Sequence, residues 1–313
     1  MDTDAPEIQA AWSSRIRHST FSPGIVTKNS VKFPAPAKIN LSLKVVAKRP
    51  DGFHEIETLM APISLADTLD IERTDAPGTA FTCSDATLPV DDNNLVVRAA
   101  KLFFERTKIS SGVRIHLEKR VPHGAGLGGG SSDAATTLIG LNALFDTKLD
   151  TPTLSAMAAE LGSDIPFFVY YSAAMCRGRG ELVEPIPLHE NLPLLLIKPA
   201  FGVPTPWAYK CWAGSVELPG VPYAAQSFPW GTLVNDLERP VFEKYIFLAT
   251  LKTWLLAQPE AIGALMSGSG STTIALLRDK SMGAALVEKA HAEFGPDLWT
   301  CACSTIAHCT AAA

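Results

Sequence analysis

The chain has 313 residues, of which 47% are hydrophobic and 19% are charged, and its formal net charge is −5. This length and composition are typical of a globular protein with two domains, each with its own core. The acidic balance and the scattered basic residues argue against a nucleic-acid-binding surface. No stretch approaches the roughly eighteen apolar residues of a membrane span, so we expect neither nucleic acid nor membrane among the partners.

Residues 1–32 combine acidic and basic side chains with proline and glycine, and they contain no apolar run long enough for the core of a signal peptide. Their acidic residues also argue against an organelle transit peptide. We therefore expect residues 1–32 to be a disordered extension of a cytoplasmic protein.

The six cysteines lack the spacing of a disulfide framework, which favours reduced thiols. Near the end of the chain, Cys301, Cys303, His308 and Cys309 leave a metal cluster open as an alternative. Their spacing does not match the paired ligand loops of a structural zinc site, so the thiol interpretation is preferred.

Hydrophobic periodicity predicts a mixture of strands and helices from about residue 31 onward. Residues 39–45 alternate apolar and polar side chains, as in a strand with one buried face, and residues 50–52 form a turn before a second extended stretch. Residues 94–106 carry an apolar stripe at helical spacing. Further strands are predicted at residues 67–73, 79–83, 113–118, 193–198 and 272–277, and further helices at 239–258 and 281–294.

The most informative stretch is residues 122–145, which begins with a glycine-rich loop and continues into an Ala/Leu-rich helical pattern. Glycine permits positive φ angles and close approach of the backbone to a ligand. A helix that starts behind such a loop offers unpaired N–H groups and the positive end of its dipole to an anion. The loop therefore predicts a phosphate-binding site. Its glycines are Gly124, Gly126, Gly128, Gly129 and Gly130, and Ser131 and Ser132 follow.

Two better-known glycine motifs fit part of this stretch. Gly124, Gly126 and Gly129 match the G-x-G-x-x-G fingerprint of dinucleotide-binding folds. The strand before that fingerprint is normally buried on both faces, whereas residues 113–118 alternate and are followed by two cations and a proline. A Walker loop would need a lysine where Gly130 stands. Both motifs are therefore disfavoured.

Three motifs in order resemble those of the GHMP kinase superfamily. The first is PAPAKINLSL (residues 34–43), with Lys38 and Asn40; the second is the glycine loop; the third is MSGSGSTTIALL (residues 266–277). Together they are far more specific than any one motif alone. The resemblance implies an α+β, two-domain fold, with an N-terminal nucleotide domain that contains a left-handed βαβ unit and a C-terminal ferredoxin-like domain. We expect one domain at residues 33–177, to which the C-terminal tail could add a closing strand, and a second at 178–313.

Within the superfamily, four segments resemble the branch that acts in the non-mevalonate isoprenoid pathway. They are DGFHEIETLM (51–60), GLGGGSSDAA (126–135), ELGSDIPFF (160–168) and PTPWAY (204–209). The resemblance implies ATP-dependent phosphorylation of the 2-hydroxyl of a methylerythritol that carries a cytidine diphosphate group. The alternatives are another GHMP kinase acting on a sugar, homoserine or a mevalonate-type alcohol, and a catalytically silent relative that senses a metabolite. We expect a monomer or homodimer.

The resemblance also implies the catalytic pair. Asp164 would be the base or orienter of the substrate hydroxyl, and Lys38 would pair with it and stabilise developing negative charge. Without the resemblance, Asp164 could equally be a helix N-cap before Pro166, and a lysine on the polar face of a strand would be solvated.

The remaining site residues follow from the same resemblance. Phe53, where the family usually has tyrosine, and Tyr209 would sandwich cytosine, and His54 would hydrogen-bond its edge. Asn40, Thr205, Gly268 and Gly270 would complete the substrate site. ATP would lie against the loop, Asn94 and Lys119, although Asn94 could be a helix cap and Lys119 a solvated charge. We expect Mg²⁺ with ATP, and Ser132 is the candidate metal ligand. The role of His123 is left open. The loop residues assigned to ATP are Pro122, Gly124, Gly126, Leu127, Gly128, Gly129, Gly130, Ser131 and Ser132.

Overall fold

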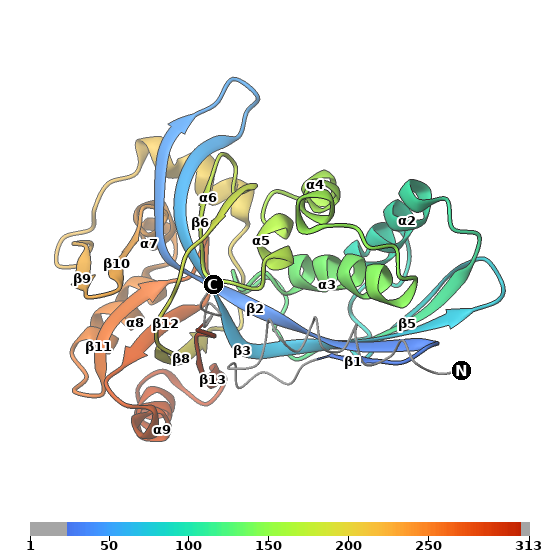
Figure 1. Cartoon of the computed structure of the whole chain (residues 1–313). Coiled ribbons are helices and arrows are strands. Elements are labelled where there is room, and N and C mark those ends of the chain that lie inside the picture. Colours follow the sequence, from blue (N-terminus) through green and yellow to red (C-terminus); the bar gives the residue numbers. More distant parts are fainter. Residues whose placement is uncertain (1–23, 308–313) are drawn as a thin grey trace.

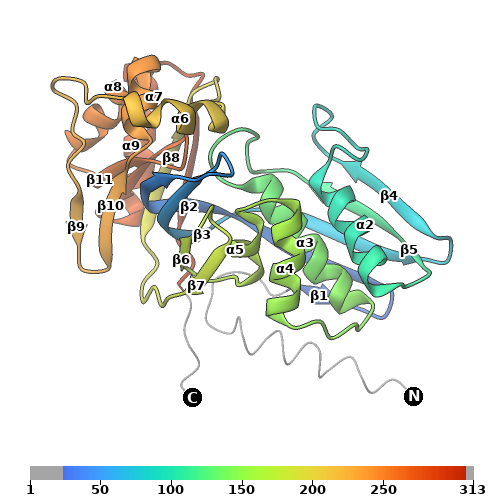
Figure 2. The ribbon, with the colours of Figure 1, turned by 90° about the horizontal axis from the view of Figure 1, so that it is seen from above.

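The structure, a computed structural model, describes residues 24–307 and confirms the α+β class (Figure 1). Among these residues the strands form a nine-stranded sheet and a four-stranded sheet. Figure 2 shows the two parts side by side, with the four-stranded sheet and its helices in the orange half of the molecule. Every helix in residues 24–307 falls short of the length and apolar character needed to cross a bilayer.

Two long antiparallel strands, β2 (Ser30–Lys48) and β3 (His54–Thr74), run through the centre of the molecule (Figure 1). The tip that joins them projects beyond the rest of the sheet. The sequence predicted separate strands before and after residue 65, but β3 is continuous. Its apolar positions contact different cores along its length, so it has no single alternating pattern to read.

Four helices cover one face of the nine-stranded sheet and enclose the first core (Figure 1). They are α2 (Leu95–Thr107), α3 (Gly129–Leu144), α4 (Thr151–Leu161) and α5 (Ile165–Val169). The sheet has the order β4-β5-β3-β2-β10-β9, with β1 beside β2 and the β6–β7 hairpin beside β3. Its shorter strands are β1 (Ile25–Val26), β4 (Gly78–Cys83), β5 (Gly112–Glu118), β6 (Ala174–Arg177), β7 (Leu182–Pro185), β9 (Gln226–Phe228) and β10 (Gly231–Asn235).

The second sheet is antiparallel in the order β11-β12-β8-β13. Its strands are β8 (Pro193–Lys198), β11 (Ala261–Met266), β12 (Thr273–Leu277) and β13 (Trp299–Ser304). The accompanying helices are α6 (Thr205–Cys211), α7 (Glu238–Lys244), α8 (Ile246–Leu256), α9 (Gly283–Phe294) and the short 3₁₀ turns Trp212–Gly214 and Lys280–Met282. The single helix predicted at 239–258 is therefore two helices, because Tyr245 leaves helical geometry (φ −113°, ψ 68°).

Several elements connect the two halves of the chain. Strand β10 pairs in parallel with β2, so a strand from the C-terminal half belongs to the N-terminal sheet. The expected boundary after residue 177 falls in the turn between β6 and β7, which both belong to that sheet. The last described strand, β13, pairs with β8 in the second sheet, and a single bridge from Thr305 to Ile63 reaches β3. The domain boundaries stay a prediction. Residues 1–23 of the proposed disordered extension lie outside the described residues, but its last part is ordered: Ile25–Val26 form β1, and β2 begins at Ser30, because this segment pairs with the sheet.

Strand β2 contributes to three successive hydrophobic cores. Its early residues, such as Phe33, pack beneath the helices; Ile39 lies between the two sheets; Val45 packs near α7 and α8. Register shifts interrupt its pairing with β3 near residues 37, 41 and 46. Because both faces are buried in the middle of the strand, Lys38 and Asn40 are 6% and 3% exposed. Of the polar side chains predicted from alternation, Asn40 is buried, Ser42 is half-buried and Lys44 is exposed to solvent.

Candidate active site

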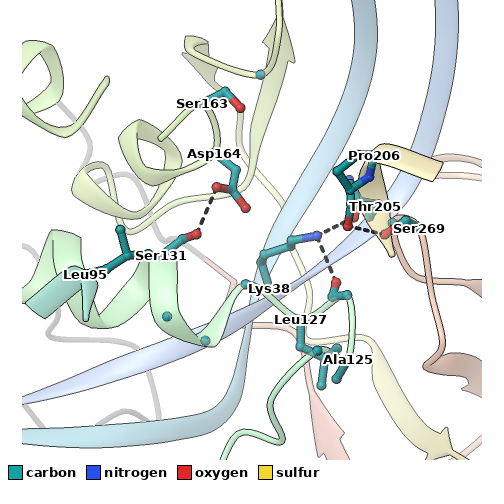
Figure 3. Close-up of a pocket in the computed structure, with 18 of the residues that line it drawn as sticks. Lys38, Leu95, Ala125, Leu127, Ser131, Ser163, Asp164, Thr205, Pro206 and Ser269 are labelled. Atoms are coloured by element: carbon teal, nitrogen blue, oxygen red, sulfur yellow. Dashed lines mark hydrogen bonds between the residues drawn. The ribbon is translucent and has the colours of Figure 1, made fainter. Parts of the chain in front are cut away.

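A cavity of about 980 Å³ is lined by residues from β2, β3, the glycine loop, the start of α3, the β6–β7 turn, α6 and the loop after β11. These segments come from both halves of the chain. Figure 3 shows its centre, where Lys38, Ser131, Asp164 and Thr205 face one another. Each of the four belongs to a different segment among those that resemble the family.

The glycine loop has the backbone geometry that its composition predicts. Gly124, Gly126 and Gly128 have φ angles of 63°, 75° and 68°. At Gly126 a Cβ atom would lie 2.5 Å from the carbonyl oxygen of Ser267, so glycine is also required by the close approach of the third motif. The second and third motifs thus pack directly against each other.

Helix α3 begins immediately behind this loop. Gly128 is its N-cap, and no side chain caps the first turn. The N–H groups of the first turn have no partner within a helix, and the dipole places partial positive charge there. The cavity reaches Gly129, Gly130 and Ser131 at this end of the helix, which is therefore suited to phosphate.

Lys38 is held from two sides. Its Nζ donates to Asn40 Oδ1 at 2.6 Å and to the carbonyl oxygen of Gly126 at 2.9 Å. Asn40 Nδ2 donates in turn to Thr58 Oγ1 at 2.8 Å. Burial lowers the pKa of Lys38, and the Asp164 carboxylate opposes that shift. The solvated lysine considered from the sequence is therefore not the arrangement found.

Asp164 occupies the N-cap position of α5, but its side chain makes no cap hydrogen bond. Its Oδ1 instead accepts a hydrogen bond from Ser131 Oγ at 2.9 Å, at the start of α3 (Figure 3). No direct ion pair joins Asp164 and Lys38, both of which are described; each approaches the same space from its own element. The Ser131 contact leaves Asp164 Oδ2 for another partner in the cavity.

The Lys119 side chain is buried and ion-paired, in contrast to the solvated charge considered from the sequence. Its Nζ lies 2.5 Å from Asp67 Oδ2 and 2.9 Å from Asp133 Oδ2, and all three side chains are at least 92% buried. Asp67 Oδ1 also accepts from the backbone N–H groups of Arg120 and Val121. Burial raises the pKa of Asp133 to about 8, with Lys119 opposing the shift and Asp67 adding to it. This cluster fixes the chain between β5 and the glycine loop.

Asn94 is the N-cap of α2, as its alternative interpretation held. Its side chain accepts from Val96 N at 2.9 Å and donates to the carbonyl oxygen of Pro89 at 2.8 Å. The residue also lines the cavity beside Leu88 and Leu95. The cap and a place in the nucleotide region are therefore compatible.

The other end of the cavity is aromatic. The rings of His54 and Tyr209 stack at 5.4 Å, and Trp212 meets the edge of His54 at 6.1 Å. Phe53 is 50% exposed, with the Arg179 guanidinium 4.9 Å from its ring centre. Burial, and to a lesser degree Lys48, lower the pKa of His54, so its imidazole is neutral at pH 7.

A short polar bridge closes the cavity on the side of the third motif. Thr205 Oγ1 and Ser269 Oγ lie 2.7 Å apart, which connects the start of α6 to the glycine-rich turn after β11 (Figure 3). Gly268 lines the cavity near Lys38 and Asn40. Gly270 lies behind it, against Met266.

Apart from Ser132 and Gly270, every residue assigned from the sequence lines the cavity. Ser132 is fully buried, and its Oγ has no hydrogen-bond partner among the described residues. His123 is exposed at the rim. Cys301 and Cys303 lie on β13, the last strand in the order of the second sheet, and do not line the cavity. His308 and Cys309 lie outside the described residues. The functional roles assigned to the site residues from the sequence stay predictions, and the role of His123 stays open.

Two residues that were not predicted from the sequence support the site from behind. Asn235 Nδ2 donates to the carbonyl oxygens of Met266 and Gly268, both at 2.7 Å, and so shapes the third motif. Ser267 Oγ donates to the Gly126 carbonyl oxygen at 3.2 Å. Ser267 lies inside a quoted motif and could have been found there, whereas Asn235 stands in a segment whose pattern carries no such signal.

Comparison with known proteins agrees with this geometry. The family model for the N-terminal domain of GHMP kinases matches residues 94–172, and the model for the C-terminal domain of GHMP kinases matches residues 227–297. The first match includes the glycine loop and Asp164. The second includes the turn after β11.

Curated relatives extend the match to most of the chain. The 4-diphosphocytidyl-2-C-methyl-D-erythritol kinase of Methylacidiphilum infernorum is 42% identical over 279 residues, covering 87% of this chain and 96% of that protein. The enzyme of the same name from Synechococcus sp. (strain CC9605) is 42% identical over 266 residues, covering 78% and 87%. A crystal structure of 4-(cytidine 5'-diphospho)-2C-methyl-D-erythritol kinase matches with a TM-score of 0.73 at 36% identity, covering 89% of this chain and all of that one. The chain therefore belongs to the 4-diphosphocytidyl-2-C-methyl-D-erythritol kinase family of the GHMP kinases.

Proposed function

We propose that this protein transfers the γ-phosphoryl group of ATP to the 2-hydroxyl of 4-diphosphocytidyl-2-C-methyl-D-erythritol. One observation carries the proposal: a single cavity contains the phosphate-type loop, the Lys38–Asp164 region and the aromatic end. The family membership supports the same substrate. The loop end suits a triphosphate, and the aromatic end suits a nucleobase.

The chemistry assigned to the chain's own residues is positioning and charge stabilisation. The substrate hydroxyl attacks the γ-phosphorus, the bond from that phosphorus to the β–γ bridging oxygen breaks, and ADP leaves. Asp164 Oδ2 receives the hydroxyl proton while Ser131 holds Oδ1. Lys38, fixed by Asn40 and Gly126, stabilises negative charge that develops on the transferred group.

Magnesium fits this arrangement as a counterion of the phosphates and would supply charge neutralisation there. The candidate ligand stays Ser132, whose Oγ lacks a partner among the described residues; its side chain is fully buried and outside the cavity lining, so it would reach a metal at the phosphates only after a local shift at the start of α3. The oligomeric state, monomer or homodimer, also stays a prediction.

The test is ADP release from ATP and magnesium with a panel of alcohols: the cytidyl substrate, mevalonate, homoserine and galactose. We expect turnover with the cytidyl substrate alone. In Asp164→Ala we expect kcat to fall about 10²- to 10⁴-fold, because a general base is lost, while ATP binding is retained. Asp297→Ala, at an exposed site outside the cavity, is the matched control and should keep full activity.

Equal turnover with another alcohol would identify a different GHMP kinase. Binding of ATP and cytidyl compound without turnover in the unmodified protein would identify a silent sensor. Either result would overturn the proposal.

A further inference from the structure

The turn between β6 and β7 reaches the cavity with a single side chain, Arg179. Gly178 and Gly180 flank it, with φ angles of 72° and 116° that favour glycine. Arg179 belongs to none of the segments on which the family resemblance was recognised.

This turn is fastened between the two functional regions of the cavity. Gly178 accepts a backbone hydrogen bond from Ile56 at 2.8 Å, two residues after His54. Gly180 packs on the other side against the backbone of Ser163, the neighbour of Asp164. Arg179 therefore lies between the aromatic end and the catalytic carboxylate.

The Arg179 side chain is held by weak interactions. Its guanidinium carbon lies 4.9 Å from the ring centre of Phe53, and its Nε lies 3.3 Å from Glu181 Oε1. The two side chains of that ion pair are 30% and 20% exposed. At 3.3 Å the ion pair is longer than a well-formed charge-assisted hydrogen bond, and the cation–π contact is made with a half-exposed ring, so neither contact holds the guanidinium strongly. A stronger partner that enters the cavity can therefore displace the guanidinium from the ring.

A phosphate group is such a partner, because guanidinium binds phosphate through two parallel, charge-assisted hydrogen bonds. In the proposed substrate a diphosphate joins the cytidine to the methylerythritol. With the base at Phe53 and Tyr209 and the alcohol at Asp164, the diphosphate must cross the region that Arg179 occupies. Lys48 and Lys210 also line this end, but both are exposed.

We propose that Arg179 is a ligand of the substrate diphosphate, and that it covers the face of Phe53 until cytosine takes its place. The inference rests on the proposed function. In this arrangement Arg179 leaves the Phe53 ring when the base binds and contacts the diphosphate. The protein should therefore bind nucleoside diphosphates more tightly than nucleosides.

The test compares the dissociation constants of cytidine, CMP and CDP, measured by calorimetry, in the unmodified protein and in Arg179→Gln. We expect CDP to bind the unmodified protein much more tightly than cytidine does. In Arg179→Gln this ratio should fall about tenfold or more, because a charge-assisted pair is lost. Cytidine itself should bind as well or better, because Phe53 is uncovered.

Two further variants complete the experiment. Arg179→Lys keeps the positive charge but lacks the planar guanidinium that binds phosphate through two hydrogen bonds. It should therefore recover part of the ratio of CDP to cytidine affinity. Arg177→Gln is the control, since Arg177 pairs with Glu57 and Glu184 outside the cavity. In steady-state kinetics, Arg179→Gln should raise the KM of the cytidyl substrate and leave the KM of ATP unchanged.

An unchanged ratio of CDP to cytidine affinity in Arg179→Gln would overturn the inference, as would an equal loss of cytidine binding. Failure of every cytidine compound to bind the unmodified protein would instead refute the proposed function.

Discussion

The two ends of the cavity are built in opposite ways. At the phosphate end, backbone geometry and buried charges shape the surface: the glycine loop, the first turn of α3 and the Lys119 cluster with Asp67 and Asp133. At the aromatic end, the surface is made by side chains, and Phe53 is half exposed. The phosphate end is therefore part of the folded core, whereas at the aromatic end Tyr209 and Trp212 pack against a core and Phe53 does not.

This difference separates binding from folding. A substitution at the phosphate end removes interactions that also hold the protein together. A substitution of the half-exposed Phe53 at the aromatic end removes a contact to the ligand while most packing persists. Three predictions test the contrast.

The largest expected effect is at Lys119. Lys119→Met leaves Asp67 and Asp133 buried without their cation, which typically costs about 3–5 kcal/mol of unfolding free energy. Urea denaturation measures this loss. Lys101→Met is the control, because its ion pair with Asp92 is exposed and such pairs contribute about 0–1 kcal/mol. Similar losses in the two variants would show that the phosphate end is not supported by buried charge.

An intermediate effect is expected at Gly126. Gly126→Ala and Gly124→Ala both place a side chain at positive φ, but only the former forces Cβ against the Ser267 carbonyl oxygen. We therefore expect Gly126→Ala to be less stable than Gly124→Ala by about 1–3 kcal/mol, as for other overpacked sites. Thermal unfolding measures the difference. Equal stabilities of the two variants would mean that the backbone at Ser267 moves away from the added Cβ at little cost.

The smallest effect on folding is expected at Phe53. Because the ring is half exposed, Phe53→Ala should leave the unfolding free energy almost unchanged. It should raise the KM of the cytidyl substrate about 5- to 150-fold, since base stacking contributes about 1–3 kcal/mol. The KM of ATP should stay the same, and Phe53→Tyr should restore the substrate KM. An unchanged substrate KM in Phe53→Ala would remove Phe53 from the base site.

The same contrast explains what could be read from the sequence. The glycine loop was predictable because positive φ and close backbone approach demand glycine at fixed positions. Lys38 and Asp164 were located through motif resemblance, but their local contacts were not. The Ser131–Asp164 and Lys38–Gly126 hydrogen bonds join residues 33 and 88 positions apart, and no local pattern encodes such pairs.

Three other features could not be predicted from the sequence, for related reasons. Asp67 and Asp133 resemble ordinary polar positions, yet they are buried around Lys119, because tertiary packing decides burial. Strand β3 was predicted in pieces because its side chains face different cores along its length. The α7–α8 break at Tyr245 also lacked a proline or glycine to signal it.

The parallel pairing of β10 with β2 has a mechanical consequence. Beneath the cavity, Val234 and Asn235 pair with Ser42 and Leu43, and Asp236 adds two hydrogen bonds to the β2 backbone. A hinge motion that separates the two halves would break these strand-pairing hydrogen bonds, so we expect this part of the cavity to be rigid. The projecting β2–β3 tip and α6 lie at the rim of the cavity (Figure 1). Because the tip and α6 carry the two sides of the aromatic end, we expect a cross-link between them to slow exchange of the cytidyl compound while leaving the phosphate end unchanged.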